Sequence, residues 1–189
     1  LWREVSNSLV ALDRGDPINP MYTAYLRDGE NWLVNQLQQT ELMEPAEGDL
    51  PMATFGGNLY IWDRKTQQLW KYANGFYADV PTEWITNRGS ASYDQVVDVQ
   101  VDGRVYLLNR DASVSVFEGG QVVQQFAAPQ LPDPVSTVAR FVVTPDVLAE
   151  DGVTVAQPGY IYILDTGNER VLQLSKTDGS LVQQIRARS

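Results

Sequence analysis

One short string occurs three times along the chain: Gly57-Asn-Leu-Tyr-Ile-Trp-Asp63, Gly103-Arg-Val-Tyr-Leu-Leu-Asn109 and Gly159-Tyr-Ile-Tyr-Ile-Leu-Asp165. Each copy is a glycine, any residue, an aliphatic residue, a tyrosine, two apolar residues and then Asp or Asn. The starts lie 46 and then 56 residues apart. A second string follows two of the copies at a similar offset, at 120–126 and 179–185. Two linked matches indicate an internal repeat.

Each repeat is predicted to form four short antiparallel strands, because apolar runs alternate with Gly, Asp, Asn and Pro. In the third repeat, extra residues around 146–158 separate the first two strands, where a loop can lengthen without disturbing the sheet. The expected strands are 51–55, 59–62, 69–72 and 77–80, then 96–101, 105–108, 114–117 and 122–126, then 141–143, 161–164, 171–174 and 181–185.

Four antiparallel strands that recur at this spacing are typical of the blades of a β-propeller. The third repeat continues as Asp165-Thr-Gly-Asn168-Glu-Arg170 and then Lys176-Thr-Asp-Gly179. This stretch resembles the NHL-type propeller repeat, in which an aliphatic-Tyr strand is followed by Asp, Asn and Arg at this spacing. The resemblance is specific over 159–185 only, and it implies a fold and a habit of binding partners rather than one activity.

The other two repeats depart from that pattern at the matching positions. The first has Asp63, Thr66 and Gln68, and the second has Asn109, Ala112 and no matching Arg.

We interpret Asp165, Asn168 and Arg170 as a structural turn signature rather than a ligand site. Asp and Asn side chains hydrogen-bond backbone groups in turns, and an Arg can hold the carboxylate.

The first part of the chain, 1–47, is predicted to be a separate acidic segment that is mainly helical. Residues 1–49 contain nine acidic and three basic residues. Apolar residues recur at helical spacing near the start, a second short helix is expected to end at Gly29, and helix is favoured over strand for 31–43. The alternative is a further blade, because the length is close to one repeat. The residues that carry the helical pattern are Trp2, Val5, Leu9 and Leu12, then Tyr22, Tyr25 and Leu26.

The charge and composition exclude several classes of function. The 189 residues include 24 Asp and Glu against 14 Lys and Arg, a net charge of −10, and neither Cys nor His. Such a surface repels phosphate backbones, so we expect no nucleic-acid binding, and no apolar run is long enough to insert into a membrane. Catalysis by Ser-His-Asp or Cys-His groups and imidazole-based metal sites are excluded.

The remaining candidates are carboxylates and aromatic side chains. Asp94, Asp98 and Asp102 lie four residues apart, but they do not form a calcium-loop pattern, so we predict no metal, cofactor or catalytic residues. The recurring tyrosines Tyr60, Tyr106 and Tyr162 are expected in the core. Aromatic residues in or near a loop of the first repeat suit partner contacts, and these are Phe76, Tyr77 and Trp84.

The sequence thus predicts an all-β partial propeller with a short N-terminal helical segment. Three blades, about 48–90, 91–132 and 133–189, cannot close a ring. A protein partner or a second copy of the chain is expected to complete it, and the alternatives are further sequence or the N-terminal segment. We predict a non-catalytic protein-interaction, sensor or scaffold module, in a bacterial envelope assembly and outside the cytoplasm. The alternative is a propeller that binds a carbohydrate or small molecule, with carboxylate-based catalysis.

Overall fold

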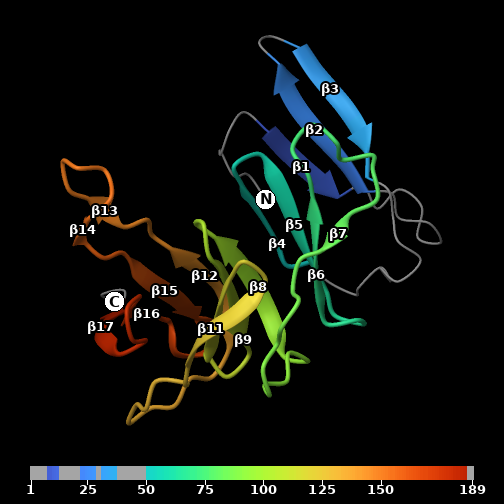
Figure 1. The fold of residues 1–189 in the computed structure, drawn as a ribbon. Helices are drawn as coiled ribbons and strands as arrows, with labels where there is room; N and C mark the ends of the chain where they lie inside the picture. Colours follow the sequence, from blue (N-terminus) through green and yellow to red (C-terminus); the bar gives the residue numbers. More distant parts are fainter. Residues whose placement is uncertain (1–7, 13–21, 29–30, 38–49, 187–189) are drawn as a thin grey trace. The chain divides into compact units, whose positions relative to one another are not determined.

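The computed structural model describes residues 8–12, 22–28, 31–37 and 50–186, and these form an all-β fold (Figure 1). Among them the single helical element is a short 3-10 turn, η1 (Thr166–Asn168). No helix in this part of the chain has the length and hydropathy to cross a membrane. The chain divides into two compact units, Leu1–Thr86 and Asn87–Ser189.

The helix prediction for the N-terminal segment is wrong where the structure describes it. Strands β1 (Ser8–Leu12), β2 (Tyr22–Asp28) and β3 (Asn31–Gln36) form an antiparallel sheet in the order β1-β2-β3, with Leu9 paired to Tyr25. The aromatic and β-branched residues of β2 and β3 favour strands, and pairing between strands outweighs a short helical periodicity. Trp2 and Val5 lie outside the described residues.

The alternative of a further blade at the N-terminus stays a prediction. The three described strands form a simple up-and-down sheet, whereas a blade has four strands.

The first sheet follows in the same unit. It consists of β4 (Met52–Phe55), β5 (Asn58–Asp63), β6 (Gln68–Tyr72) and β7 (Thr82–Glu83), in sequence order. The fourth strand was predicted at 77–80. The structure places it later because Tyr77 is buried and donates its hydroxyl hydrogen to the Gly57 carbonyl, which holds the preceding loop against the sheet.

The second and third sheets form the other unit, and their strands agree closely with the sequence prediction. The second sheet has β8 (Val96–Val101), β9 (Val105–Asn109), β10 (Val114–Glu118) and β11 (Gln121–Phe126). The third has β12 (Val138–Val143), β15 (Tyr160–Asp165), β16 (Arg170–Ser175) and β17 (Leu181–Arg186). Each is an antiparallel up-and-down sheet of four strands, which is the topology of a propeller blade.

The extra residues of the third repeat form a two-stranded hairpin. Strands β13 (Val147–Leu148) and β14 (Val155–Gln157) pair with each other and lie between β12 and β15 in the chain. Figure 1 shows this hairpin projecting away from the third sheet.

The second and third sheets pack face to face around one core, which has these buried members: Tyr106, Leu108, Ala112, Val114, Val116, Phe126, Val138, Phe141, Ile161, Ile163, Leu172 and Leu174. A buried carboxylate joins their first strands, because Asp98 on β8 accepts a hydrogen bond from the Phe141 N–H on β12 at 3.2 Å. Asp98 is one of the three carboxylates that lie four residues apart in the sequence. It is 3% exposed, because the packing of β12 on β8 covers it.

Candidate functional site

The turn between β15 and β16 holds the three residues of the predicted turn signature in one cluster, which we call the clamp. Arg170 Nε donates to Asp165 Oδ2 at 2.8 Å, and Asn168 Nδ2 donates to the same oxygen at 2.8 Å. The other carboxylate oxygen accepts the N–H groups of Ser136 and Thr137 from the loop before β12. The clamp therefore fastens the turn to the neighbouring loop.

Electrostatics favour the ionised clamp. Burial alone raises the pKa of Asp165, but the hydrogen bonds from Asn168, the Thr137 N–H, Arg170 and the Ser136 N–H outweigh burial and hold it below its ordinary value. Because Asp165 and Arg170 are 0% and 2% exposed, the pair is sealed from water.

The Arg170 guanidinium also donates hydrogen bonds inside the protein through both of its Nη atoms. Nη2 donates to the Asp133 carbonyl at 2.7 Å and to the Pro134 carbonyl at 3.2 Å, while Nη1 donates to Gln184 Oε1 at 2.9 Å. One side chain thus fills the space between the turn, the preceding loop and the outer strand β17.

The first sheet keeps a carboxylate at the same place but has a neutral amide, Gln68, where the third sheet has Arg170. Asp63 accepts hydrogen bonds from the Lys65 N–H and the Thr66 hydroxyl, and it pairs in register with Gln68. Gln68 is buried and donates to the Ile85 carbonyl at 3.1 Å, while its own oxygen accepts the Ile85 N–H at 3.1 Å. An amide therefore ties this turn to the chain after β7.

The second sheet closes its turn differently. Asn109 stands where the other sheets have Asp63 and Asp165, and its N–H donates to the Ser113 carbonyl across a loop of three residues, 110–112. The loop of the third sheet has four residues, 166–169. The residue across from Asn109 is consequently Ser113, a small side chain where the third sheet has Arg170.

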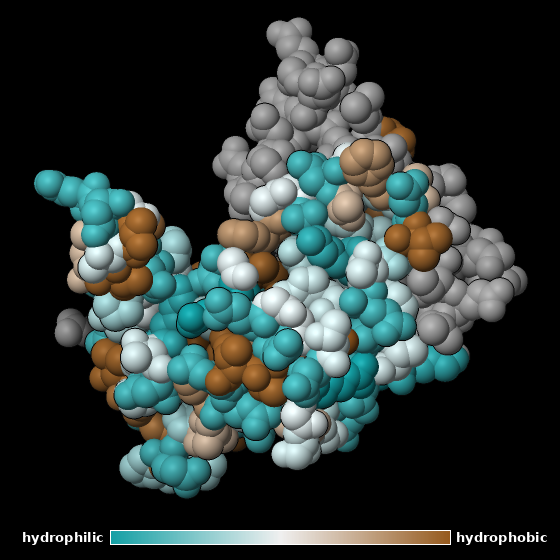
Figure 2. Space-filling view, in the orientation of Figure 1, coloured by the Kyte–Doolittle hydropathy of each residue, from teal (hydrophilic) through white to brown (hydrophobic). Residues whose placement is uncertain are grey.

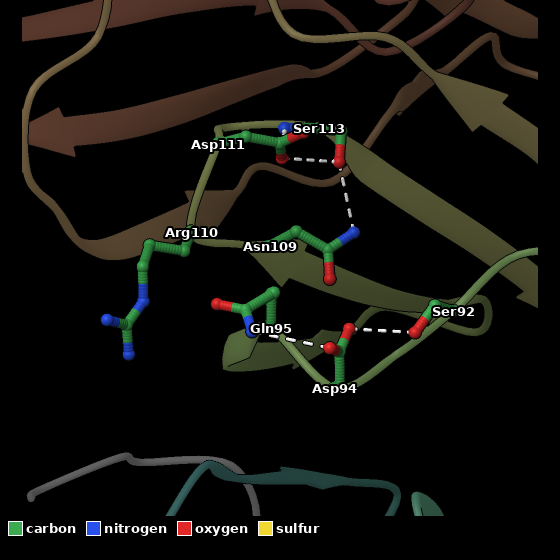
Figure 3. Close-up of a pocket in the computed structure, with 7 residues that line it drawn as sticks. All are labelled: Ser92, Asp94, Gln95, Asn109, Arg110, Asp111 and Ser113. Atoms are coloured by element: carbon green, nitrogen blue, oxygen red, sulfur yellow. Dashed lines mark hydrogen bonds between the residues drawn. The ribbon is translucent and has the colours of Figure 1, made fainter.

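A pocket lies at this turn, with a volume of about 350 Å³. Figure 3 shows the seven polar side chains that line it, which are Ser92, Asp94, Gln95, Asn109, Arg110, Asp111 and Ser113. Asn109 Nδ2 donates to Ser113 Oγ at 3.0 Å, whereas Asn109 Oδ1 is buried and has no hydrogen-bond partner. A buried acceptor without a donor costs free energy, so a donor that reached it would be stabilised.

Two carboxylates give the pocket its charge. Asp94 accepts hydrogen bonds from Ser92 Oγ at 2.7 Å and Gln95 Nε2 at 3.4 Å, and these bonds hold its pKa below its ordinary value. Asp111 accepts the N–H and hydroxyl of Ser113 through Oδ1. Asp94 is therefore a carboxylate at neutral pH and an acceptor rather than a proton donor.

The structure separates the three predicted contact residues. Phe76 is 64% exposed, and Trp84 is half-buried with its ring edge-to-face with Tyr60 at 6.2 Å between centroids. Tyr77 is 2% exposed, so its assignment as a contact residue is wrong, and it packs in the core of its unit. Phe76 and Trp84 stay predicted contacts.

The recurring tyrosines differ in depth. Tyr60 and Tyr106 are buried, and burial raises the pKa of each hydroxyl. Tyr162 is only half-buried, against Tyr160 at 6.3 Å between ring centroids, because it lies on the open face of the third sheet.

The acidic triplet weighed for calcium is divided among separate contacts. Asp102 pairs with the buried Lys176, which also binds Asp146 at 2.9 Å. Asp98 lies between the sheets and Asp94 lines the pocket. In the described part of the chain, no three acidic side chains gather as metal ligands would.

Sequence reasoning missed the pocket. The pocket depends on the small side chains of Ser92 and Ser113 and on Asn109, and these residues do not form a recognisable sequence motif. The available signal was the departure of the second repeat from the Asp, Asn, Arg pattern, which showed where a side chain was missing.

Comparison with known proteins finds solved structures of low similarity. No family model and no curated protein matches the sequence. Among solved structures, glutaminyl cyclase of Myxococcus xanthus is 17% identical with a TM-score of 0.46, over 89% of this chain and 67% of that one. The WD40 β-propeller domain of Doa1 is 13% identical with a TM-score of 0.40, over 97% of this chain and 66% of that one.

The chain thus spans about two thirds of the length of each of these proteins. Identities this low carry no information on activity, so the propeller-type architecture rests on the four-stranded sheets themselves. The NHL-type assignment stays a prediction.

Proposed function

We propose that the chain is a non-catalytic protein-interaction module built of propeller blades. The observation that supports this proposal is the distribution of exposed apolar side chains. Of the fourteen large apolar residues exposed in the described part of the chain, nine lie between 142 and 185, in the third sheet and its hairpin. Concentrated exposed apolar surface is typical of protein contacts.

The open face of the third sheet supplies one contact surface. Leu164, Val171 and Ile185 lie in one row across β15, β16 and β17, and Val142 pairs with Tyr162 in the neighbouring row. Val142, Leu164 and Ile185 are 51%, 39% and 44% exposed. The opposite face of the same sheet packs on the second sheet, so the stacking of blades can continue on the open face.

The projecting hairpin supplies the other surface. Leu148 on β13 pairs with Val155 on β14, and Val153 lies in the bend between the two strands. Their exposed fractions are 50%, 46% and 81%. Figure 2 shows brown, apolar atoms on this hairpin.

We assign the open face to a second copy of the chain, which would bring a further blade. The charged residue in these two rows is Arg140, which pairs in register with Leu164 and binds Asp98 at 3.5 Å. The net charge of −10 therefore opposes the contact mainly over longer distances, which salt screens. Such a contact fits the prediction of a homo-oligomer that completes the propeller. The envelope location outside a bacterial cytoplasm belongs to the same proposal.

Light scattering over a range of protein concentrations tests this contact. We expect the mass to rise above the 21.1 kDa of one chain and to return to it in the variant Val142→Glu. Val123→Glu on β11 is the matched control, since Val123 is 48% exposed on the other sheet, and it should associate like the unchanged protein. A monomer at every concentration, or equal behaviour of the two variants, would contradict the assignment.

The second candidate is a propeller that binds a small molecule or a carbohydrate in the second-sheet pocket. The unpartnered Asn109 Oδ1 favours a ligand there. However, all seven lining residues are polar and none offers a ring on which a sugar can stack. Thermal stabilisation by oligosaccharides, lost on substituting Asn109→Ala, would support this candidate.

A further inference from the structure

The pocket of the second sheet occupies the same place in its blade as Arg170 occupies in the third. In the third sheet the Thr166 N–H donates to the Thr137 carbonyl at 2.9 Å, and in the second the Arg110 N–H donates to the Gln95 carbonyl at 2.9 Å. Thr166 and Arg110 each follow the residue that ends the second strand of the sheet. The two bonds are therefore equivalent, and they align the loop before β8 with the loop before β12.

This alignment assigns every residue of the pocket a counterpart in or beside the clamp. Asn109 matches Asp165, Ser113 matches Arg170, and Asp111 matches Gly167. On the facing loop, Ser92, Asp94 and Gln95 match Pro134, Ser136 and Thr137. In the third sheet these positions surround a buried guanidinium. In the second sheet they surround an open cavity.

The carboxylates also occupy different positions in the two sheets: at the end of a strand in the third sheet, and in the loops that line the pocket in the second. The clamp has one carboxylate, at the strand end, and it pairs with an arginine of the same chain. The pocket has a neutral amide at the strand end and two carboxylates, Asp94 and Asp111, at positions where the third sheet has Ser136 and Gly167. The second sheet therefore keeps acceptors for a guanidinium but lacks the guanidinium itself.

We propose that this pocket binds the arginine side chain of a basic protein partner. The guanidinium would donate to the Asp94 and Asp111 carboxylates and to Asn109 Oδ1, as Arg170 donates to Asp165 and the loop carbonyls. The planar fork of five N–H donors suits two carboxylates and an amide oxygen better than the point charge of an ammonium does. This inference rests on the proposed role in protein binding.

Arg110 is the one basic residue at the pocket, and its side chain extends away from Asp94 and Asp111 (Figure 3). The pocket carries a net charge of −1 when Arg110 is counted with the two carboxylates. An entering cation is therefore attracted rather than repelled.

The probe for the experiment is N-acetyl-arginine-methylamide, with the matching citrulline compound as the uncharged control. Titration of the ¹⁵N-labelled chain should shift the Asn109 side-chain amide and the amides of Asp111 and Ser113, and it should saturate with a Kd on the order of 1 mM. Citrulline has the same shape without the charge and should shift none of them. Equal shifts with both compounds, or shifts elsewhere only, would overturn the proposal.

Three variants and one control variant sharpen the test. Asp94→Asn and Asp111→Asn should each weaken binding about two- to fivefold, as expected for an exposed ion pair. Ser113→Arg should abolish binding, because the new side chain would fill the cavity as Arg170 fills the clamp. Gln121→Arg adds the same charge at an exposed site on β11 and should reduce binding little. Unchanged binding by Ser113→Arg would contradict the proposal.

The readouts separate this inference from the proposed function. Loss of self-association in Val142→Glu concerns the open face of the third sheet, whereas the probe titration concerns the pocket alone. If the probe fails to bind while the chain still associates, the arginine site is wrong and the interaction module stands. If the probe binds an unassociated chain, the pocket stands and the contact assigned to a second copy is wrong.

Discussion

The turns of the second and third sheets follow the same repeated string, but one is open and the other is closed. In the third sheet, Asp165 and Arg170 seal the turn against the preceding loop, and both are buried. In the second, Asn109 and Ser113 leave a cavity bordered by two carboxylates. The loop differs by one residue and the facing side chain changes from arginine to serine. Comparison of the two repeats thus shows that the second sheet lacks the arginine of the third, and that an arginine from a partner could take its place.

The largest expected effect comes from opening the sealed turn. Substituting Arg170→Met leaves the Asp165 carboxylate buried without its cation, so we expect the free energy of unfolding to fall by about 3–5 kcal/mol. Circular dichroism in urea measures it. Arg186→Met is the control, because its pair with Asp133 is 53% and 70% exposed and should contribute less than about 1 kcal/mol. Equal losses in both variants would show that the clamp is not a sealed pair.

The first sheet tests how much a neutral amide, Gln68, contributes to the free energy of unfolding at the place where the third sheet has Arg170. Substituting Gln68→Ala would leave the N–H and carbonyl of Ile85 without partners, which should cost about 2 kcal/mol. All five tryptophans lie in this unit, so their fluorescence follows its unfolding. Thr82→Ala, on the exposed β7, should change stability by less than about 0.5 kcal/mol. A loss as large as that of Arg170→Met would remove the distinction between the two turns.

The stability that the third turn contributes should depend on acidic pH, whereas that of the second should not. The folded-state pKa of Asp165 lies below its ordinary value of 3.8, so its contribution is complete above that pH and is lost as pH falls through the folded-state pKa. Asn109 does not titrate. Thermal unfolding between about pH 3 and pH 7 should show a shallower acid dependence for Asp165→Asn than for the unchanged chain.

Other carboxylates with lowered pKa values, including Asp94 and Asp146, keep part of the acid dependence in that variant. The difference between the two curves is therefore the quantity to compare. Parallel curves would mean that the clamp does not set the acid sensitivity of its turn.

The strands were predictable wherever the repeated string placed them. Val105–Asn109 follows the sequence because it is a continuous apolar run that is buried on both faces, and Tyr160–Asp165 because its buried residues alternate along the strand. The N-terminal strands were missed, since a few apolar residues at helical spacing also fit a strand that pairs with neighbours. The local pattern of apolar residues does not show whether a segment has a neighbouring strand with which to pair.

The candidate site was less predictable than the fold. The sequence singled out Asp165 and Arg170 because charged residues at fixed spacing form a visible pattern. It did not single out Ser113, because a cavity arises where a side chain is small and its surroundings are large. It also assigned Tyr77 to the surface, where its neighbours in the loop lie, although its hydroxyl reaches the Gly57 carbonyl inside.

We infer that the second-sheet pocket is the unfilled counterpart of the Arg170 site. A double-mutant cycle of Asn109→Asp and Ser113→Arg tests it most directly, since together they restore the two residues of the clamp. We expect the double variant to be more stable than the sum of the single changes by about 1–2 kcal/mol, with the arginine probe no longer bound. Strictly additive effects, with the pocket still open to the probe, would contradict it.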